Sequence, residues 1–501
     1  MPLKVLDEVP RRAPCADPEV QAIIQAGTES VEWISQEFAG VDLRDKRLDR
    51  RLVKTAAELA KSPGSPINEA CGDWASTQAA YRLFDNHRAS PEAILTPHVE
   101  ETATRMAACV GPLLVMQDTV FFSYGQHPKT RGLGPIGSSN AAHERGLIMH
   151  NALAFTASGV PLGILSQRIW ARQEVPEEGY QEKIERLQVT PIEEKESSKW
   201  LLALEETVAR TPRGVKVVTV ADRESDFFEF LAAAEEHRAL FLIRARTDRL
   251  LISEDSAGHE SLLEAVAQAP LLGSLEVQIP GNGKRKARSA SVAVRVARVT
   301  LKPPPRRGAA KVSGSTEPLA VHAIWAAEKS APQGAEPISW VLLTNLPVAD
   351  FEAASEKIGW YGKRFAIETW HKVLKSGCQV ERCLLETAER LSRYLTLFSI
   401  IGVRLMHVAC LARVTPQLPA TEVFSQEEIE ALHVRIHHAR PPDKPPTLRE
   451  AVRMIGSLGG HLGRKGDGEP GMTVIWRGWI SLYETVIAFR AARQAGMIDS
   501  S

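Results

Sequence analysis

The sequence is poor in cysteine and carries no net charge. Six cysteines occur in 501 residues, and none belongs to a Cys-x-x-Cys pair. This argues against a disulfide-stapled domain or a cysteine-based zinc motif, and free thiols in a reducing compartment are expected. The 61 basic residues balance the 61 acidic ones. The total charge therefore neither favours nor excludes a nucleic-acid partner, because local patches decide that question.

We also expect no secretory leader and no membrane span in this sequence. Its first ten residues have no apolar core of the kind that a signal peptide needs. The most apolar run, at 395–412, contains Arg404 and His407, so a buried helix is expected there. With 44% apolar and 24% charged residues, the chain has the composition of a globular protein of two to four domains. We expect it to be cytoplasmic.

One stretch, residues 361–375, places four functional side chains at helical spacing. They are Tyr361, Arg364, Glu368 and Lys375. At about 100° per residue, all four fall within roughly 60° of one another on a helix. The apolar residues expected to pack inward are Ile367, Trp370, Val373 and Leu374. The alternative is an ordinary surface helix with an Arg364–Glu368 ion pair.

Two aspartates follow aliphatic runs that predict buried strands. Asp118 follows the run at 113–116, and Asp222 follows the run at 215–220. Neighbouring strands would present both carboxylates at one point, and a helix carrying Glu368 would add a third. Three hard oxygen donors suit Mg²⁺, with Mn²⁺ as a substitute. Two such ions, about 4 Å apart, activate a nucleophile and stabilise the leaving oxygen in phosphoryl transfer.

These residues resemble the DDE triad of RNase H-like transposases. The spacing Tyr361-x2-Arg364-x3-Glu368-x6-Lys375 is similar to the YREK signature of the cut-and-paste insertion-sequence family typified by the transposon-five transposase. Further similar motifs follow the family's order, at 117–119, 195–200, 222–226, 340–344 and 476–479. The resemblance covers nearly the whole chain beyond about residue 30.

The resemblance implies an α/β fold, with an RNase H-like mixed-sheet catalytic core, a β-rich insertion and helical N- and C-terminal domains. The alternation of strands and helices from 113 to 244 fits such a mixed sheet. The expected divisions are a loosely ordered leader at 1–28, a helical DNA-binding domain at 29–91, the core at 92–246 and 336–408, the insertion at 247–335, and a helical dimerisation domain at 409–501. The insertion carries a basic loop at 280–288, which is either a solvated turn or a contact to the DNA backbone.

The resemblance also assigns roles to individual residues. Asp118, Asp222 and Glu368 would be the catalytic metal ligands. Tyr361, Arg364 and Lys375 would contact DNA phosphates, for which guanidinium and ammonium groups are suited. A tyrosine nucleophile at Tyr361 is the alternative, and it is disfavoured because the Arg and His cluster that accompanies such a nucleophile is missing.

Three further residues are expected near DNA. Trp340 matches the family position whose indole stacks on a base flipped out of the duplex, and a core tryptophan at a strand start is the alternative. Arg244 and Arg246 follow a predicted strand and are expected to reach DNA, with an ion pair at the rim of the site as the alternative.

The N-terminal domain contains a predicted basic ridge. Asp42 would cap a helix at 43–61 and place Arg44, Arg47 and Arg51 on one face, beside an apolar stripe. Such a ridge suits docking along DNA phosphates, whereas the alternative is an ordinary solvated face. The resemblance implies that this domain reads the end of the transposable element.

The implied function is DNA transposition. The enzyme would hydrolyse phosphodiester bonds at the element ends with two Mg²⁺ ions, form a hairpin intermediate and join the ends to target DNA. Its partners would be double-stranded DNA and a second copy of the chain, in the bacterial cytoplasm at the nucleoid. A catalytically silent DNA-binding protein and an RNase H-like nuclease without strand transfer are the alternatives.

Overall fold

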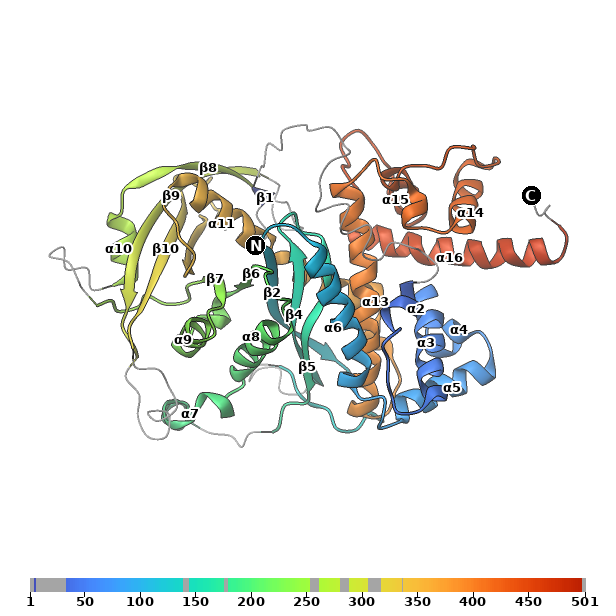
Figure 1. Cartoon of the computed structure of the whole chain (residues 1–501), viewed down its shortest axis with the longest axis horizontal. Helices are drawn as coiled ribbons and strands as arrows, with labels where there is room; N and C mark the ends of the chain where they lie inside the picture. Colours follow the sequence, from blue (N-terminus) through green and yellow to red (C-terminus); the bar gives the residue numbers. More distant parts are fainter. Residues whose placement is uncertain are drawn as a thin grey trace.

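A computed structural model describes residues 4–5, 33–137, 144–174, 179–252, 261–279, 288–304, 317–335 and 337–497 (Figure 1). Apart from Lys4–Val5, the leader predicted at 1–28 lies outside the described residues. So does the basic loop predicted at 280–288, except for Arg288. The remaining predictions can be compared with the fold.

Within the described residues, eleven strands form one continuous sheet. The strands are β1 (Lys4–Val5), β2 (Leu113–Ser123), β3 (Gly134–Pro135), β4 (Arg145–Thr156), β5 (Pro161–Trp170), β6 (Val217–Ala221), β7 (Leu240–Arg244), β8 (Leu271–Ile279), β9 (Arg288–Leu301), β10 (Leu319–Glu328) and β11 (Ser339–Thr344). Their order is β1-β8-β9-β10-β11-β7-β6-β2-β4-β3, and β5 pairs with β4.

Five of these strands have the connection pattern of an RNase H-like core. β2, β4 and β5 form an antiparallel meander. On the other side of β2 the sheet continues with β6 and then β7, each parallel to the strand before it. Helix α8 (Ser198–Arg210) precedes β6 and α9 (Phe228–Glu236) joins β6 to β7. The predicted α/β fold class is confirmed.

Strand β2 is longer than the sequence pattern indicates. It was expected to end at Asp118, but it continues to Ser123, so Asp118 lies in the middle of the strand. The reason is that β4 pairs with β2 along its whole length, from Leu113 opposite Thr156 to Ser123 opposite Gly146. Gly146 permits this close pairing, because a Cβ there would lie 1.8 Å from the Phe122 carbonyl oxygen.

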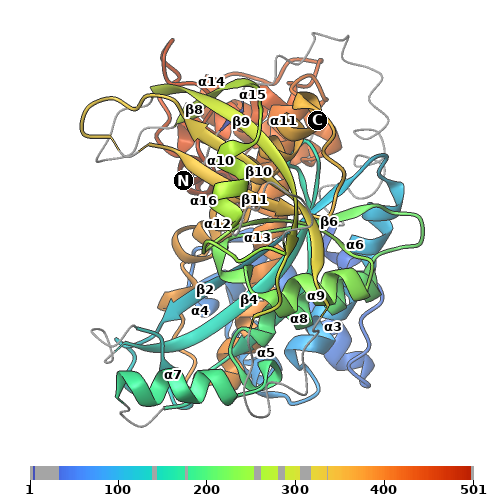
Figure 2. The same cartoon turned by 90° about the vertical axis from the view of Figure 1, so that its left-hand side faces the viewer.

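The β-rich insertion extends the core sheet. β11 pairs antiparallel with β7, and β10, β9 and β8 continue outward from it, each antiparallel to the last. Figure 2 shows these long strands, with α10 (Leu262–Gln268) lying against β9 and β10. The segment between Asp222 and Glu368 is therefore joined to the core by main-chain hydrogen bonds.

Alternating side chains divide the apolar residues of the sheet between two faces. On β11, Trp340 and Leu342 belong to one buried cluster, whereas Val341 and Leu343 belong to the other. The second cluster lies beneath α8, α9 and α10. The first lies beneath α11 (Phe351–Lys363), α12 (Phe365–Lys372) and α13 (Ala388–Val414). This period-two alternation is what a sheet covered on both sides requires.

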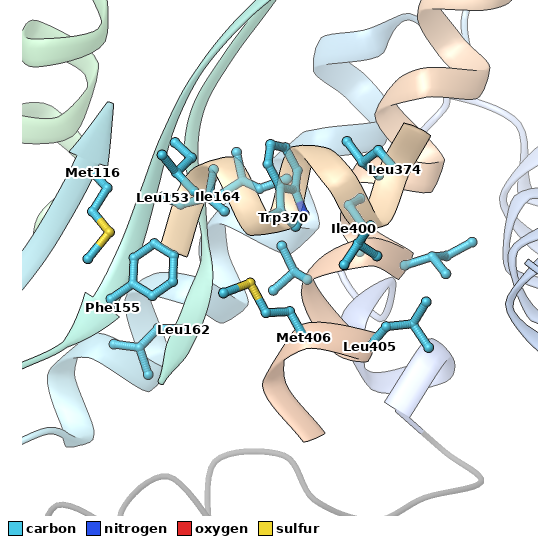
Figure 3. Close-up of a cluster of buried hydrophobic side chains, with 14 of the residues drawn as sticks. Met116, Leu153, Phe155, Leu162, Ile164, Trp370, Leu374, Ile400, Leu405 and Met406 are labelled. Atoms are coloured by element: carbon cyan, nitrogen blue, oxygen red, sulfur yellow. The ribbon is translucent and has the colours of Figure 1, made fainter. Parts of the chain in front are cut away.

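Helix α12 is held in place by its apolar side. Trp370 and Leu374 point toward side chains of β4, β5 and α13, including Leu153, Ile164 and Ile400 (Figure 3). The indole of Trp370 also donates a 3.3 Å hydrogen bond to the Ser399 carbonyl. The inward packing predicted for Ile367, Trp370, Val373 and Leu374 is confirmed, since all four are fully buried.

Helix α13 corresponds to the most apolar run of the sequence. Its 27 residues are long and apolar enough to cross a membrane, but 89% of its most apolar window is buried inside the protein. The predicted buried helix is therefore confirmed.

From the sequence, the chain is predicted to stay helical from Lys375 to about residue 412, and this prediction is wrong. A π-helical turn, η5 (Val373–Gly377), is followed by Gln379 at a φ of 50° and by the 3-10 turn η6 (Val380–Arg382). Because that positive φ lies outside the right-handed helical region, the chain changes direction there. Helix α13 then begins at Ala388, where the Thr387 side chain caps it by accepting from the Arg390 N–H.

The helices outside the core form an N-terminal and a C-terminal group (Figure 1). The N-terminal helices are α2 (Trp33–Glu37), α3 (Lys46–Lys61), α4 (Ile67–Cys71) and α5 (Trp74–Asp85), and the helix that follows them, α6 (Pro91–Ala108), lies against β5 and α13 of the core. The C-terminal helices are α14 (Gln426–His437), α15 (Leu448–Leu458) and α16 (Met472–Gln494), preceded by the 3-10 turn η7 (Ala420–Glu422). Between β5 and α8 lie α7 (Tyr180–Val189) and the 3-10 turn η2 (Ile192–Glu194).

The start of the basic helix differs from the prediction. Helix α3 begins at Lys46 because Asp45 caps it by accepting from the Arg47 N–H at 2.9 Å. Asp42, the predicted cap, accepts instead from the Arg44 N–H. Arg44 has a φ of 58° and lies before the helix, so it does not belong to the helical face on which it was predicted.

A buried polar cluster joins the N-terminal helices to the core. Arg105 on α6 donates two 3.0 Å hydrogen bonds to Glu37 on α2, and its Nε donates to the Leu162 carbonyl on β5. His98 accepts from the Ile164 N–H through Nε2 and donates to Glu37 through Nδ1. Burial alone would raise the pKa of Glu37, but the Arg105 and His98 interactions hold it well below its ordinary value.

Candidate active site

Three carboxylates converge where β2, β6 and α12 meet. β2 and β6 are parallel, with Met116 opposite Val220. Asp118 and Asp222 lie two residues further along their chains, so they project from neighbouring positions at this edge of the core. Glu368 lies in the first turn of α12, which packs against β2.

Two of the three acids accept a hydrogen bond from the local backbone. The Asp118 carboxylate accepts from the Thr119 N–H at 2.8 Å. Asp222 caps the 3-10 turn η3 (Arg223–Ser225) by accepting from the Glu224 N–H at 2.8 Å. Glu368 has a side chain that is 49% exposed. Two of the acids are thus fixed in orientation, while the third faces solvent.

The predicted stripe of functional residues is carried by a broken helix. α11 ends at Lys363, Arg364 forms the junction, and α12 begins at Phe365. Tyr361, Arg364 and Glu368 still face the acidic site, but Lys375 lies in the π-helical turn η5. Its Nζ lies 3.4 Å from a Glu381 carboxylate oxygen and 5.7 Å from the centroid of the Phe122 ring. The prediction of one regular helix over 361–375 is therefore wrong in detail.

Arg364 lies between two of the acids. Its Nη2 donates to Glu368 at 2.6 Å, and its Nη1 lies 3.8 Å from Asp118 Oδ2. The side chain is buried, and its Nε and Nη1 have no hydrogen-bond partner within the described residues. The Arg364–Glu368 ion pair, which the alternative interpretation placed on an ordinary surface helix, is present, but it lies at the acidic site.

Burial is the main influence on the pKa of Asp118. Burial raises the pKa of Asp118 to about 7, with further raising contributions from Asp222 and Glu368, although Arg364 and the Thr119 N–H act in the opposite direction. A buried carboxylate such as that of Asp118 requires a compensating positive charge. By chemistry, the three oxygen donors fit a hard divalent ion.

In this structure Arg364 lies close to two of these donors, Asp118 and Glu368. Among the residues that the structure describes, no group of three or more His, Cys, Asp or Glu side chains is arranged to hold a metal ion. Metal ligation by Asp118, Asp222 and Glu368 therefore stays a prediction.

Two histidines near Asp118 were not predicted from the sequence to belong to the site. His371 is buried one turn after Glu368, with Nδ1 3.9 Å from Asp118 Oδ2, and burial together with the Lys375 and Arg364 charges lowers its pKa to about 3. His150 on β4 shares a 2.9 Å hydrogen bond with Thr119 and lies edge-on to Trp200. His371 was detectable from its spacing of three from Glu368, whereas His150 required the β2–β4 register.

Trp340 and Arg244 form a wall beside Tyr361. The Trp340 side chain is 4% exposed, and its ring lies edge-on to Tyr361 with the centroids 5.0 Å apart. Arg244 lies over the Trp340 ring and donates to the Ser339 carbonyl at 3.1 Å. Trp340 therefore occupies the core position given as its alternative, and stacking on a base would require its ring to become uncovered.

Arg246 and Asp226 lie further from the three acids. The Arg246 side chain is exposed, and its backbone N–H donates to Asp226. The Asp226 side chain is fully buried and pairs with Arg249. Asp226 thus orients the chain after β7.

The basic residues of the N-terminal helices lie away from the three acids. In Figure 1, α3 lies across α13 from β2. Arg47 is exposed and Arg51 is partly exposed on α3, while Arg44 lies just before it. Two exposed aromatic residues on α5 were not singled out from the sequence, Trp74 (74% exposed) and Tyr81 (40% exposed).

Comparison with known families identifies the two flanking regions. Residues 30–89 match the model for a transposase DNA-binding domain. Residues 400–498 match the model for the transposase Tn5 dimerisation domain. A DNA-binding region, an RNase H-like sheet and a dimerisation region together define a transposase that binds DNA and forms homodimers. The two matches support a Tn5-like transposase.

Proposed function

We propose that the protein catalyses cut-and-paste transposition by metal-dependent phosphoryl transfer, in the bacterial cytoplasm. The observation that carries this proposal is the convergence of Asp118, Asp222 and Glu368 from β2, β6 and α12. Carboxylates at these places in an RNase H-like core suit the binding of two Mg²⁺ ions, or Mn²⁺ in their place. When bound, such ions activate the nucleophile and stabilise the leaving oxygen.

The chain's own residues would bind and orient the DNA. Arg364 is buried and always charged, so after release from Glu368 its free donors suit a non-bridging phosphate oxygen. Lys375 would add a positive charge on the same side of the acidic site as Arg364. The Tyr361 hydroxyl can donate a hydrogen bond to a phosphate. Trp340 and Arg244 would limit the space beside the reacting strand.

Each chemical step in this proposal is the same in-line displacement at phosphorus. A water oxygen first forms a bond to phosphorus, the bond to the 3′-oxygen breaks, and that oxygen takes up a proton. The resulting 3′-hydroxyl attacks the opposite strand to form a hairpin, which a second water opens. The freed 3′-ends then attack target DNA, and one site serves every step.

The exposed face of α5 is the proposed reader of the element end. Trp74 and Tyr81 lie seven residues apart, so they share one side of the helix. Exposed aromatic residues within a DNA-binding region suit contact with base edges, while the arginines of α3 suit phosphate contacts.

The test is cleavage of a duplex that carries the flanking element's end, in the presence of Mg²⁺. Wild type should nick this duplex and then form hairpins. Glu368→Ala should bind the duplex but cut it at least about a thousandfold more slowly, because a metal ligand is lost. Glu352→Ala, which removes an exposed glutamate on α11, is the matched control and should cut like wild type.

The second candidate is a catalytically silent DNA-binding protein. The Arg364–Glu368 pairing favours it, because a carboxylate engaged by arginine is a poor metal ligand. Wild type that binds the end yet never cuts with Mg²⁺ or Mn²⁺ would establish this second function. Cleavage without joining of the cut ends would instead indicate a nuclease.

A further inference from the structure

A polar cavity lies between the turn that follows Glu368 and the first turns of α16. Its volume is about 340 Å³. The lining residues come from the segment 375–382 and from Trp476, Arg477 and Ile480. The cavity thus connects the segment beside the acidic site to the region that matches a dimerisation domain.

The charge of this cavity is predominantly positive. Lys375, Arg382 and Arg477 line it, and Glu381 is its one lining carboxylate. Glu381 is already engaged, because it pairs with Lys375 at 3.4 Å and accepts from the Ser123 N–H at 2.8 Å. Arg382 and Arg477 are exposed, and within the described part of the chain their side chains make no ion pair or hydrogen bond.

Close packing holds together the two segments that carry these arginines. A Cβ on Gly377 would lie 2.9 Å from the Trp476 ring, so this glycine lets α16 lie directly against the π-helical turn. Trp476 is buried there, and Arg477 is the next residue. On the other wall, Gln379 at a φ of 50° turns the chain just before Arg382. The cavity is therefore built by tertiary packing.

We infer that this basic cavity binds a phosphodiester of the DNA backbone, gripped by Arg382 and Arg477 beside Lys375. Guanidinium groups match the geometry of phosphate oxygens, and unpaired cations at a cavity mouth attract a polyanion. A strand that leaves the acidic site past Lys375 would pass this cavity. The inference rests on the proposed function, since it assigns a further part of the same DNA path.

The test is the salt dependence of DNA binding without metal. A duplex of roughly 30 base pairs is titrated in EDTA between about 50 and 200 mM salt. Arg382→Gln and Arg477→Gln should each reduce the slope of log K against log salt by about 0.9, and the double variant by about twice that. Arg477→Lys, which keeps the charge, should retain most of the slope. Arg464→Gln, an exposed arginine that does not line the cavity, is the matched control and should keep the wild-type slope.

Several outcomes would overturn the inference. One is an unchanged slope in the double variant, with thermal unfolding like that of wild type. An unchanged slope with weakened dimer formation would show that the cavity takes an acidic group of a second copy. Competition by inorganic phosphate without any change in the DNA slope would show an adventitious ion only. The binding measurement contains no metal, so it does not depend on cleavage. Failure of the cleavage experiment would therefore count against the proposed function, but it would not change the salt dependence of DNA binding.

Discussion

The guanidinium of Arg364 donates a 2.6 Å hydrogen bond to the carboxylate of Glu368, one turn further along the chain. The same guanidinium approaches Asp118 to 3.8 Å. It therefore offsets the carboxylate charge at the place where a divalent cation would bind. Metal binding is expected to release Glu368 from Arg364, and the released guanidinium then becomes available for a DNA phosphate.

Removal of this guanidinium should strengthen metal binding and weaken catalysis. A positive charge about 4 Å from a bound cation is unfavourable by several kcal/mol at an effective dielectric constant of about 20. Arg364→Gln should therefore bind Mn²⁺ at least about tenfold more tightly than wild type, as measured by calorimetric titration. It should also cleave the element end more slowly, because a phosphate contact is lost.

The control for this prediction is Arg464→Gln, which removes an exposed arginine at a distant position. Its Mn²⁺ affinity should equal that of wild type. If Arg364→Gln binds Mn²⁺ no better than the control, Arg364 does not compete with the metal and its position between the acids has another purpose.

Local sequence patterns were sufficient to predict most core elements. The sequence predicts a strand at 240–244, and β7 has these bounds. It also predicts a helix at 197–210, and α8 begins one residue later. These elements are set by short apolar periods and by nearby Pro and Gly residues, which act within a few residues. The three acids could also be picked out from the sequence, because each one follows or lies within a predicted strand or helix.

Other features depend on contacts between distant segments. The length of β2 follows from its pairing with β4, and the burial of Trp340 follows from the packing of Tyr361 against it. The break after Lys375 follows from Gln379 and from α16, which lies against Gly377. Arg364 was placed correctly on the stripe, but its position between two acids could be seen only in three dimensions.

The close approach of Gly377 to Trp476 can be tested by comparing an alanine substitution at Gly377 with one at Gly359. Gly377→Ala introduces a Cβ 2.9 Å from the indole, so it should destabilise the fold by about 1–3 kcal/mol and weaken the contact of α16. Gly359 lies within α11 and a Cβ there would meet no atom within 4 Å. Gly359→Ala should therefore be neutral or stabilise by up to about 1 kcal/mol.

Denaturant unfolding followed by circular dichroism would compare the two variants. Equal midpoints for Gly377→Ala and Gly359→Ala would show that α16 does not press on the π-helical turn. Sedimentation analysis would then report whether dimer formation changes in Gly377→Ala alone, as the packing predicts.

Buried His407 makes the fold sensitive to acid. It donates from Nδ1 to the Pro161 carbonyl at 2.9 Å, and burial, with the nearby Arg404 charge, lowers its pKa from 6.5 to about 4. Between these two pKa values, His407 is therefore protonated in the unfolded chain and neutral in the folded chain. The free energy of unfolding is unaffected above a pH of about 6.5 and falls as the pH drops toward 4, in total by about 3 kcal/mol from this group.

His407→Gln keeps a donor and removes the titration. Between about pH 7 and pH 5 its free energy of unfolding should fall by about 2 kcal/mol less than that of wild type. His87→Gln, at an exposed position, should follow the wild-type pH dependence. An identical pH dependence in all three proteins would mean that His407 is not the source of the acid sensitivity.

The two kinds of exposed residue in the N-terminal region should affect DNA binding differently. Trp74→Ala and Tyr81→Ala remove aromatic groups from α5, so they should weaken binding to the element end by roughly tenfold and leave binding to random duplex nearly unchanged. Arg47→Gln and Arg51→Gln remove phosphate contacts, so they should weaken both duplexes equally and reduce the salt slope by about 0.9 each. Fluorescence anisotropy with both duplexes measures the two effects side by side. Equal losses on both duplexes for Trp74→Ala would show that α5 does not read sequence.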